Sequence, residues 1–537
     1  MAELAVNGGQ STLATAPSGT TGTSLAIQTA DEAKFPATGN FACLLQDSLT
    51  SPTQYEIVEV TAVSGATFTI TRASEPYAGS QTAQTWSAGA YITQVATVGT
   101  AAKFITAEFP ITAFGASTSL ADNLAAINAA LTAAGVSGGR VVVPPGTFVS
   151  SPFTISNPNV ALKLMAGATL QLKAGVNPTA FITVTASWCA IFGEGTIDGN
   201  AANNTSGYGV YINASAASQS LVGSHVRGVT VQHTANTAIR YEPTGTSATV
   251  TNCAVSGCTV QNTGTGSSVA EGIMFWGASN CIAEGNFVSN TANHGIVSTE
   301  GNANIIRGNQ ISNVGTGYSS GSAHGITIDG NGGSNPNSGH VISGNRVQNC
   351  YMDGIEVADA VDDVAITGNN VSNVGTGASA GAQKDGIYFG GGLAGGNRAT
   401  ITGNIVETAA GYGIHLDAPS STTRSSKPIV TGNVVRDCQF AGIYVNNTDD
   451  YIIVGNTVVD NSLAGVGSYG GIQMGTSAGP GQVQVNRVYG ANHLYNIYFA
   501  AAPTNTVLAS NNWIGPPYDT GAINTPTGVV TTAGNVT

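Results

Sequence analysis

The sequence predicts an all-β protein: a solenoid of stacked parallel coils with one N-terminal capping helix, preceded by a small β-rich domain. Three observations support this prediction. A phrase reading apolar, any, Gly, Asn, any, apolar, any, Asn or Asp recurs at 342–349, 366–373, 430–437 and 453–460. A Gly-Ile phrase falls between successive copies. The composition, with 71 Gly and 8% charged residues, is typical of tight turns around a long apolar interior.

The Gly-Ile phrase gives the length of one coil. Its glycines are Gly272, Gly295, Gly325, Gly354, Gly386, Gly413, Gly442 and Gly471. The 199 residues from the first to the last make seven intervals of roughly 28 residues, which is the range of a stacked solenoid coil. Each interval holds short period-two runs of Val, Ile and Thr between Gly, Asn and Ser, which predicts strands and turns. With parallel strands about 4.8 Å apart, seven intervals span roughly 34 Å.

The residue that closes each Gly-Asn phrase is expected to stack in a ladder at one turn, because short polar side chains at turns bond to neighbouring backbone. We assign this ladder a structural role. Its members are Asn262, Asn290, Asn313, Asn349, Asn373, Asp437 and Asp460.

The elements follow in order along the chain. Residues 1–22 read as a flexible arm, and 23–105 as the small β domain with strands near 25–27, 41–45, 55–63, 67–71 and 91–95. Residues 119–135 predict the capping helix, with Ser119 and Asp122 as its capping signature and a stripe from Leu120 to Leu131. This helix covers the open edge of the first coil of a solenoid spanning 106–515. Residues 516–537 form a polar tail.

Charge and hydropathy exclude several classes of partner. The net charge of −13, with only 16 Lys plus Arg, argues against nucleic acid. No apolar run is long enough to span a membrane, and no secretion signal opens the chain. The seven Cys lack zinc-ligand spacing, so we expect buried free thiols and synthesis in a reducing cytoplasm. We expect no cofactor.

The segment 138–148 (GGRVVVPPGTF) after a helix, then 193–199 (GEGTIDG), then Gly-Asn coils, resembles the pectate-lyase-like superfamily of right-handed parallel β-helices, which includes polygalacturonases and many phage tailspikes. The resemblance covers about residues 107–515 and implies the right-handed parallel β-helix fold. It does not fix a reaction, because the superfamily holds hydrolases, lyases, epimerases and binding proteins.

Residues 35–41, 56–58, 63–72 and 86–90 are similar to a module at the virion end of phage tail proteins. Together the two resemblances imply a phage tailspike or tail fibre, made in the host cytoplasm and located in the virion tail. They further imply attachment to a tail or baseplate protein through the N-terminal domain, a homotrimer, and a bacterial surface polysaccharide (capsule or lipopolysaccharide) as partner.

Ionisable residues stand directly before the Gly-Ile glycines of successive coils: Glu271, His294, His324, Asp353 and Asp385, followed by Tyr412. Glu356, Tyr388, His415 and Tyr444 come two residues after the glycine, and alternation is expected to place both sets outside, beside loops that grow from alternate coils. The plain interpretation is that Asp-Gly and His-Gly are turn dipeptides. The steps at 353–355, 385–387 and 324–326 are similar to those of polygalacturonases, although the paired Asp of that family is missing.

Carboxylates one coil apart stand about 5–9 Å apart, which spans both geometries of glycoside hydrolysis. We predict Asp353 and Asp385 as the acid and base or nucleophile, with Glu356 as substitute, and His324 or His415 to orient a hydroxyl or tune the pair. The predicted substrate-binding residues are Glu271, Trp276, His294, Tyr388, Tyr412, His415 and Tyr444.

Three alternatives remain open at this point. The first is a structural or receptor-binding fibre without catalysis. The second is a polysaccharide lyase or epimerase, with His324, Tyr388, Tyr412 and Lys384 as candidate groups. The third is a metal site from His294, His324 and Asp353, but three stacked coils span about 10 Å, which is wide for one ion, and we predict no metal.

Overall fold

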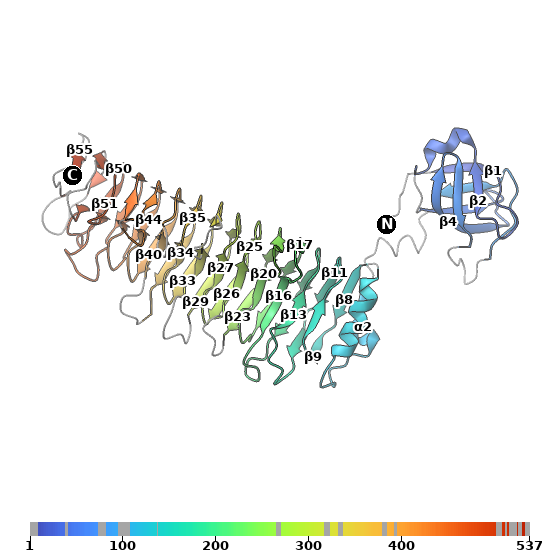
Figure 1. The fold of residues 1–537 in the computed structure, drawn as a ribbon, viewed down its shortest axis with the longest axis horizontal. Helices are drawn as coiled ribbons and strands as arrows, with labels where there is room; N and C mark the ends of the chain where they lie inside the picture. The colour runs from blue at the N-terminus through green and yellow to red at the C-terminus, as the bar shows by residue number, and fades with distance from the viewer. Residues whose placement is uncertain are drawn as a thin grey trace. The chain divides into compact units, whose positions relative to one another are not determined.

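The computed structural model describes residues 9–37, 41–73, 82–94, 108–136, 138–264, 270–315, 323–330, 337–377, 384–390, 395–420, 422–500, 507–510, 513–514, 524 and 529–531. The chain divides into two compact units, residues 1–107 and 108–537, each with its own apolar core (Figure 1). The parts of the expected loops at 265–269, 316–322 and 378–383, and most of the expected tail, lie outside the described residues.

The first unit is a closed antiparallel barrel with strand order β1-β2-β5-β4-β3-β6. Its strands are β1 Gln10–Thr15, β2 Ser24–Ile27, β3 Phe41–Gln46, β4 Tyr55–Ser64, β5 Thr67–Thr71 and β6 Tyr91–Gln94, with a 3-10 helix η1 at Thr29–Lys34. The five strands expected from the sequence are confirmed. The prediction of a flexible arm is wrong for residues 10–15, because these residues form β1, which closes the barrel between β2 and β6 and buries Leu13 completely.

A buried ion pair lies in the barrel. Nε and Nη2 of Arg72 both donate to the Glu56 carboxylate at 2.7 Å, and the Trp86 ring nitrogen donates to it at 2.8 Å. Burial raises the pKa of Glu56, but these hydrogen bonds outweigh it and hold the pKa below its usual range.

Helix α2, Leu124–Gly135, packs against the first strands of the solenoid and covers its N-terminal end, as expected (Figure 1). It begins five residues later than the sequence suggests. The Asp122 carboxylate accepts the Leu124 amide and also the amide and hydroxyl of Ser151, so residues 119–123 form a turn tied to the first coil. Leu120 is therefore exposed and does not belong to the buried stripe. A short 3-10 helix η2, Ile111–Phe114, precedes this turn.

The second unit is a parallel β-helix of three long sheets, in which each strand pairs in parallel with its equivalent one coil on. Sheet 1 contains β10 Phe153–Ile155, β13 Ala180–Val184, β16 Tyr208–Ala214, β20 Ile239–Pro243, β24 Ile273–Trp276, β27 Ile296–Thr299, β30 Ile326–Asp329, β34 Ile355–Ala358, β38 Ile387–Phe389, β41 Ile414–Leu416, β45 Ile443–Val445, β49 Ile472–Met474 and β52 Ile497–Phe499.

Sheet 2 contains β7 Glu108–Pro110, β8 Gly139–Val143, β11 Val160–Leu164, β14 Ala190–Gly193, β18 His225–Arg227, β22 Ala254–Ser256, β25 Ile282–Glu284, β28 Ile305–Arg307, β32 Val341–Ser343, β36 Ala365–Thr367, β39 Thr400–Thr402, β43 Ile429–Thr431, β47 Tyr451–Val454, β50 Gly481–Gln484, β53 Val507–Ser510 and β55 Val529–Thr531. Thus residues 529–531 of the expected tail add a strand to the solenoid.

Sheet 3 contains β9 Gly146–Ser150, β12 Ala168–Leu172, β15 Thr196–Asp198, β19 Thr230–Gln232, β23 Thr259–Thr263, β26 Phe287–Thr291, β29 Gln310–Val314, β33 Arg346–Cys350, β37 Asn370–Val374, β40 Ile405–Ala409, β44 Val434–Arg436, β48 Thr457–Val459, β51 Arg487–Tyr489 and β54 Trp513–Ile514. Three two-stranded sheets decorate the turns: β17 Ser220–Val222 with β21 Thr249–Thr251, β31 Asn337–Ser338 with β35 Val361–Asp362, and β42 Ser425–Ser426 with β46 Thr448–Asp449.

Two asparagine ladders run along the solenoid. The expected one, at the closing residue of each phrase, is partly exposed: Asn313 donates to Asn290, and Asn349 to Asn313, at 3.2 and 3.1 Å. The second ladder, which was not predicted from the sequence, consists of the Asn of each Gly-Asn pair and is buried. There, both the backbone amide and the side-chain amide of Asn345 donate to Oδ1 of Asn369 at 2.9 Å, and the same pattern repeats in neighbouring coils. This buried ladder satisfies turn amides that the sheets leave unpaired.

The Gly-Ile phrase is explained by close packing at the start of each sheet 1 strand. A Cβ on Gly325 would lie 2.2 Å from the Val347 Cγ1 atom and 2.6 Å from the Gly354 carbonyl oxygen. The following Ile points into the core and is fully buried, as at Ile326. The expectation of buried free thiols is confirmed for all seven Cys. Among the described residues, no helix has the length and apolar character that a membrane span requires.

Candidate functional site

The residues that precede the Gly-Ile glycines stack into a column along sheet 1, as expected, and from His294 to Asp385 each side chain accepts a backbone amide of the next coil. The amide of His324 donates to Nδ1 of His294 at 3.2 Å, and the amide of Asp353 donates to Nδ1 of His324 at 3.3 Å. The amide of Asp385 donates to Oδ1 of Asp353 at 2.5 Å, and that of Tyr412 to Oδ1 of Asp385 at 2.7 Å. The column therefore supplies acceptors for backbone amides between coils.

The expectation that this column faces outward is wrong for most of its members. Asp353 is fully buried, and Glu271, His324 and Asp385 are almost so. The side chains of His324, Asp353 and Asp385 accept the backbone amide of the next coil, because an unsatisfied buried amide costs about 1–3 kcal/mol. His294 and Tyr412 keep partial exposure.

The row two residues after the glycine is mixed. The strand register pairs Glu356 with Tyr388, Tyr388 with His415 and His415 with Tyr444, on consecutive strands. Glu356 and Tyr444 are partly exposed, whereas Tyr388 and His415 are buried. The expectation that Tyr388 and His415 face solvent is therefore wrong, because the neighbouring aromatic rings pack over them.

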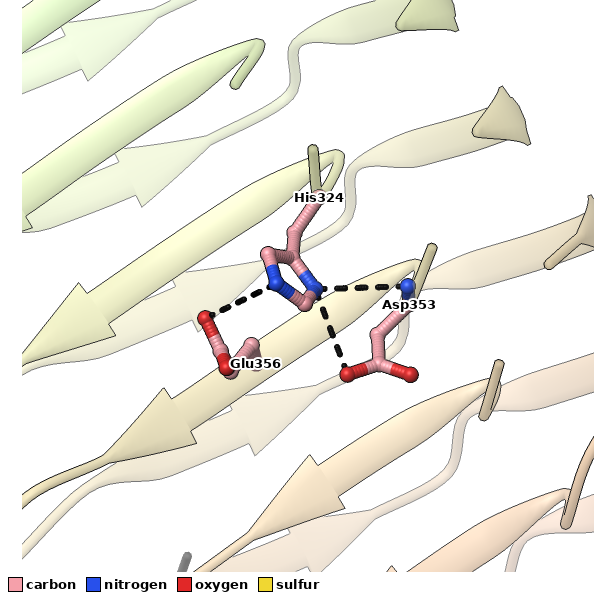
Figure 2. A group of neighbouring side chains, drawn as sticks. All are labelled: His324, Asp353 and Glu356. Atoms are coloured by element: carbon pink, nitrogen blue, oxygen red, sulfur yellow. Dashed lines mark hydrogen bonds and ion pairs between the residues drawn. The ribbon is translucent and has the colours of Figure 1, made fainter. Parts of the chain in front are cut away.

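His324, Asp353 and Glu356 form a compact cluster on two adjacent coils (Figure 2). Nδ1 of His324 lies 3.2 Å from Oδ2 of Asp353, and Nε2 lies 3.4 Å from Oε2 of Glu356. Burial lowers the pKa of His324, but the charges of Glu356 and Asp353 outweigh it and raise the pKa to about 9. Burial raises the pKa of Asp353 to about 6, against the opposing effect of His324.

The two contacts at Nδ1 of His324 require different protonation states. A neutral ring with a bare Nδ1 accepts the Asp353 amide, whereas a protonated ring donates from Nδ1 to the Asp353 carboxylate. Only the Glu356 side of the cluster reaches solvent, with 14% of that side chain exposed against 0% for Asp353. The cluster is thus a buried proton-sharing pair behind one accessible carboxylate.

A second cluster repeats this arrangement on the neighbouring coils. Nδ1 of His415 lies 2.6 Å from Oδ2 of Asp385, and its Nε2 lies 3.7 Å from Oδ2 of Asp417, whose side chain is 23% exposed. Burial lowers the pKa of His415, but Asp385 and Asp417 outweigh it and raise the pKa to about 9. Asp417 stands four residues after Gly413 and completes the second cluster, although it was not predicted as a site residue. Its position in the sequence could have identified it, because alternation along the strand places this residue on the outer face of the sheet.

Aromatic rings surround the second cluster. The rings of Tyr412 and Tyr444 stack with centroids 4.3 Å apart, and each lies within about 5 Å of the His415 ring, at 4.7 and 5.1 Å. Both tyrosines are partly exposed. Burial raises the pKa of Tyr412, so its hydroxyl stays neutral.

The remaining predicted substrate-binding residues lie further along sheet 1. Glu271 accepts the Thr237 hydroxyl and, at 3.3 Å, the Asn293 side-chain amide. The His294 ring stacks on His324 with centroids 5.3 Å apart, and burial together with the charge of His324 holds its pKa well below the usual value. Trp276 is partly exposed beside Arg240.

Among the described residues, one group of possible metal ligands lies close together: His324, Asp353 and Glu356, whose ligand atoms are within 4.8 Å of one another. The two carboxylates approach opposite nitrogens of the imidazole (Figure 2). A single ion needs all its ligands at about 2 Å, so these three residues do not fit one ion as they are arranged. We therefore interpret the cluster as a group of side chains that share protons, and not as a metal site.

Comparisons with known proteins agree on the fold. The family described as "Right handed beta helix region" matches residues 318–488. The tailspike protein of E. coli bacteriophage HK620, solved in complex with pentasaccharide, has 14% identity and a TM-score of 0.53, covering 82% of this chain and 78% of that one. The Dettilon tailspike protein has 16% identity and a TM-score of 0.50, covering 74% and 69%.

The A-module of the Azotobacter vinelandii mannuronan C-5 epimerase AlgE4 has 15% identity and a TM-score of 0.45, covering 80% of this chain and 100% of that one. No curated protein matches the sequence. At these identities the likeness concerns the fold: a right-handed β-helix that resembles phage tailspikes.

Proposed function

We propose that this right-handed β-helix chain is a phage tailspike or tail fibre that binds and hydrolyses a bacterial surface polysaccharide on the outer face of sheet 1. One observation carries the proposal. Two partly exposed carboxylates, Glu356 and Asp417, each lie beside a buried imidazole that is paired in turn with a buried aspartate. The neighbouring carboxylates raise the pKa of both imidazoles to about 9, and perturbed pKa values gather at functional sites.

The spacing of the two carboxylates favours the inverting mode of hydrolysis. Glu356 on β34 and Asp417 directly after β41 are two coils apart, because β38 lies between these strands. The register partner of Glu356 two strands away is His415, and Asp417 lies two residues beyond it, so the Cα atoms of Glu356 and Asp417 are about 12 Å apart. This is far wider than the ~5–5.5 Å of retaining enzymes, and the ~6.5–9.5 Å of inverting enzymes is reached when the two side chains lean toward each other.

Each residue then has a role. Glu356 is the general base that takes a proton from the attacking water, and Nε2 of His324, 3.4 Å from its carboxylate, holds it in place. The leaving sugar oxygen takes its proton from the Asp417 carboxyl group, and Nε2 of His415 returns a proton to that group. Asp353 and Asp385, buried behind the imidazoles, are positioning residues in this proposal and do not contact substrate. Tyr412 and Tyr444 offer partly exposed ring faces to the sugar.

A second candidate is a receptor-binding fibre without catalysis. The observation in its favour is that column side chains already serve as acceptors for backbone amides, which is a sufficient structural reason for their presence. A lyase or epimerase is less favoured, because it needs a cation beside the acidic sugar and the two clusters expose carboxylates.

Assembly into a virion belongs to the same proposal. The barrel is a compact unit with its own core, which suits a separate attachment domain that joins a tail or baseplate protein. Homotrimer formation and location in the virion tail follow the tailspike resemblance. Seven buried free thiols suit a protein made in a reducing host cytoplasm.

The test is the release of reducing ends from a panel of purified capsules and lipopolysaccharides. We expect Glu356→Gln and Asp417→Asn each to lower turnover by about 10²–10⁴-fold, the usual contribution of an acid or base, while melting temperature and polysaccharide binding persist. The matched control is Glu284→Gln, an exposed acid of sheet 2 paired with Arg307.

Full activity in Glu356→Gln would contradict the assignment of Glu356 as the general base. Binding of a panel member without any release of reducing ends would support the non-catalytic fibre. An unsaturated product that absorbs in the ultraviolet would instead indicate a lyase. The anomeric configuration of the first product, read by NMR, separates inversion from retention.

A further inference from the structure

A separate cluster of aromatic and charged side chains lies on the outer face of sheet 1, on strands β16, β20 and β24. The guanidinium carbon of Arg240 lies 5.1 Å from the Tyr208 ring centroid and 4.9 Å from the Trp276 ring centroid. Nε of Arg240 donates to Oε2 of Glu242 at 2.8 Å. The guanidinium is therefore held in one orientation by two rings and a carboxylate.

This cluster retains unused hydrogen-bonding capacity. Oε2 of Glu242 also accepts the Tyr211 hydroxyl at 2.7 Å, and Nη1 of Arg240 contacts the Met274 sulfur at 3.4 Å. Within the described part of the chain, Nη2 of Arg240 and Oε1 of Glu242 have no partner. Both side chains are partly exposed, so a donor and an acceptor stand ready for a ligand at a rigid site.

Stability alone is a weak reason for this arrangement. The side chains of Arg240 and Glu242 are only 11% and 17% exposed, and the desolvation cost of such a largely buried ion pair offsets much of its Coulombic gain. Two aromatic rings on an exposed sheet face, holding an arginine and a carboxylate, are by contrast the elements of a small-molecule site: apolar faces with a few placed polar groups.

We propose that Tyr208, Arg240, Glu242 and Trp276 form a binding subsite for a neutral sugar residue of the polysaccharide. The free guanidinium donor and carboxylate acceptor match two neighbouring hydroxyl groups, and the ring faces of Tyr208 and Trp276 that Arg240 does not cover match the apolar C–H face of a sugar. The sugar is neutral because Glu242 already compensates the charge of Arg240, so no net charge remains to attract an acidic group.

This inference rests on the proposed polysaccharide ligand and extends its footprint. From β20 to β34, which carries Glu356, the sheet order passes β24, β27 and β30. Four steps of about 4.8 Å place the subsite roughly 19 Å from Glu356 on the same face. Only a chain of several sugars can occupy both places at once, so the subsite would favour long polysaccharides over short fragments.

The experiment measures binding of the full-length protein in the Glu356→Gln background to an array of neutral and acidic bacterial oligosaccharides of graded length. We expect Trp276→Ala and Arg240→Lys to weaken binding of the longer members at least tenfold and to leave short members that bind at the Glu356 end unchanged. Arg240→Lys keeps the charge but loses the planar fork of donors, and it serves if Trp276→Ala fails to fold. The control is Trp188→Ala, a tryptophan that is 60% exposed outside the cluster.

Wild-type affinity for long members in both variants, or a requirement for an acidic sugar, would overturn the subsite. So would the absence of any glycan binding by the parent protein. Failure of the proposed hydrolysis has a different signature: binding that depends on Trp276, with no reducing ends released by the unmutated protein.

Discussion

The buried asparagine ladder permits a quantitative prediction at Asn369. Its Oδ1 accepts the backbone amide and the side-chain amide of Asn345, both at 2.9 Å, and its Nδ2 donates to the Ile342 carbonyl at 3.0 Å and to Asn404 at 2.9 Å. Asn369→Ala leaves two buried donors of Asn345 without that acceptor. At about 1–3 kcal/mol per unsatisfied donor, the loss is roughly 2–6 kcal/mol.

The assay is denaturant unfolding of the solenoid combined with hydrogen exchange at the Asn345 amide, which should lose its protection. Asn369→Leu fills the volume without restoring the acceptor, so we expect a similar loss. The matched control is Asn373→Gly in the exposed ladder, where φ is 53° and glycine is tolerated; its effect should stay within about 0.5 kcal/mol.

Rescue by Asn369→Leu would refute the reasoning, because the loss would then come from volume and not from unsatisfied donors. An equal loss in Asn373→Gly would refute it as well, since water can replace the bonds of the exposed ladder.

Three further outcomes are expected. The pKa values of His324 and His415 are raised from 6.5 to about 9 in the folded state, so these histidines stabilise the fold below pH 6.5 and this contribution is lost as the pH rises through 9. The melting temperature should fall over that window, and His415→Gln should make its dependence on pH less steep. In the barrel, Glu56→Gln leaves a buried arginine unpaired and should cost about 3–5 kcal/mol, read from the tryptophan signal of that unit; a solenoid transition that shifted equally would contradict the independence of the units. Gly325→Ala should impair folding, because the new Cβ would overlap Val347 and backbone atoms. At Gly344 a Cβ meets nothing within 4 Å, so Gly344→Ala adds only the strain of a φ of 62°, about 1–2 kcal/mol, and should still give soluble protein; equal yields would contradict this packing argument.

The solenoid could be predicted from sequence because each coil repeats the same solution to the same packing problem. Gly-Asn marks a turn whose Asn is bonded to the next coil, and Gly-Ile marks a close approach followed by a core residue. Strand β1 was missed because its sequence, QSTLAT, has one large apolar residue and reads as a polar lead. Its place depends on barrel closure with β2 and β6, which no local pattern encodes.

The site was predicted only in part. The sequence predicted the column of ionisable residues but not its burial. Alternation along a strand does not apply to these residues, because they lie at the turn just before the strand. There, the amide of the next coil determines where the side chain points, as at Asp353. Arg240 was missed for another reason. Its coil has Ala238-Ile239 at the start of the strand where later coils have Gly-Ile, so the Gly-Ile repeat did not identify this coil. Trp276 was identified, but its partners lie on strands found only through the fold.

The buried ladder gives the solenoid a direction of growth. Each Asn amide is satisfied by the oxygen of the Asn that comes later in the chain, from Asn286 through Asn309 and Asn345 to Asn486. During synthesis the newest coil therefore carries unpaired donors until the following coil emerges and folds onto it. The ribosome delivers coils in the order in which they can complete one another, so assembly can advance like a zipper from the helix-capped end, with one open edge at any moment.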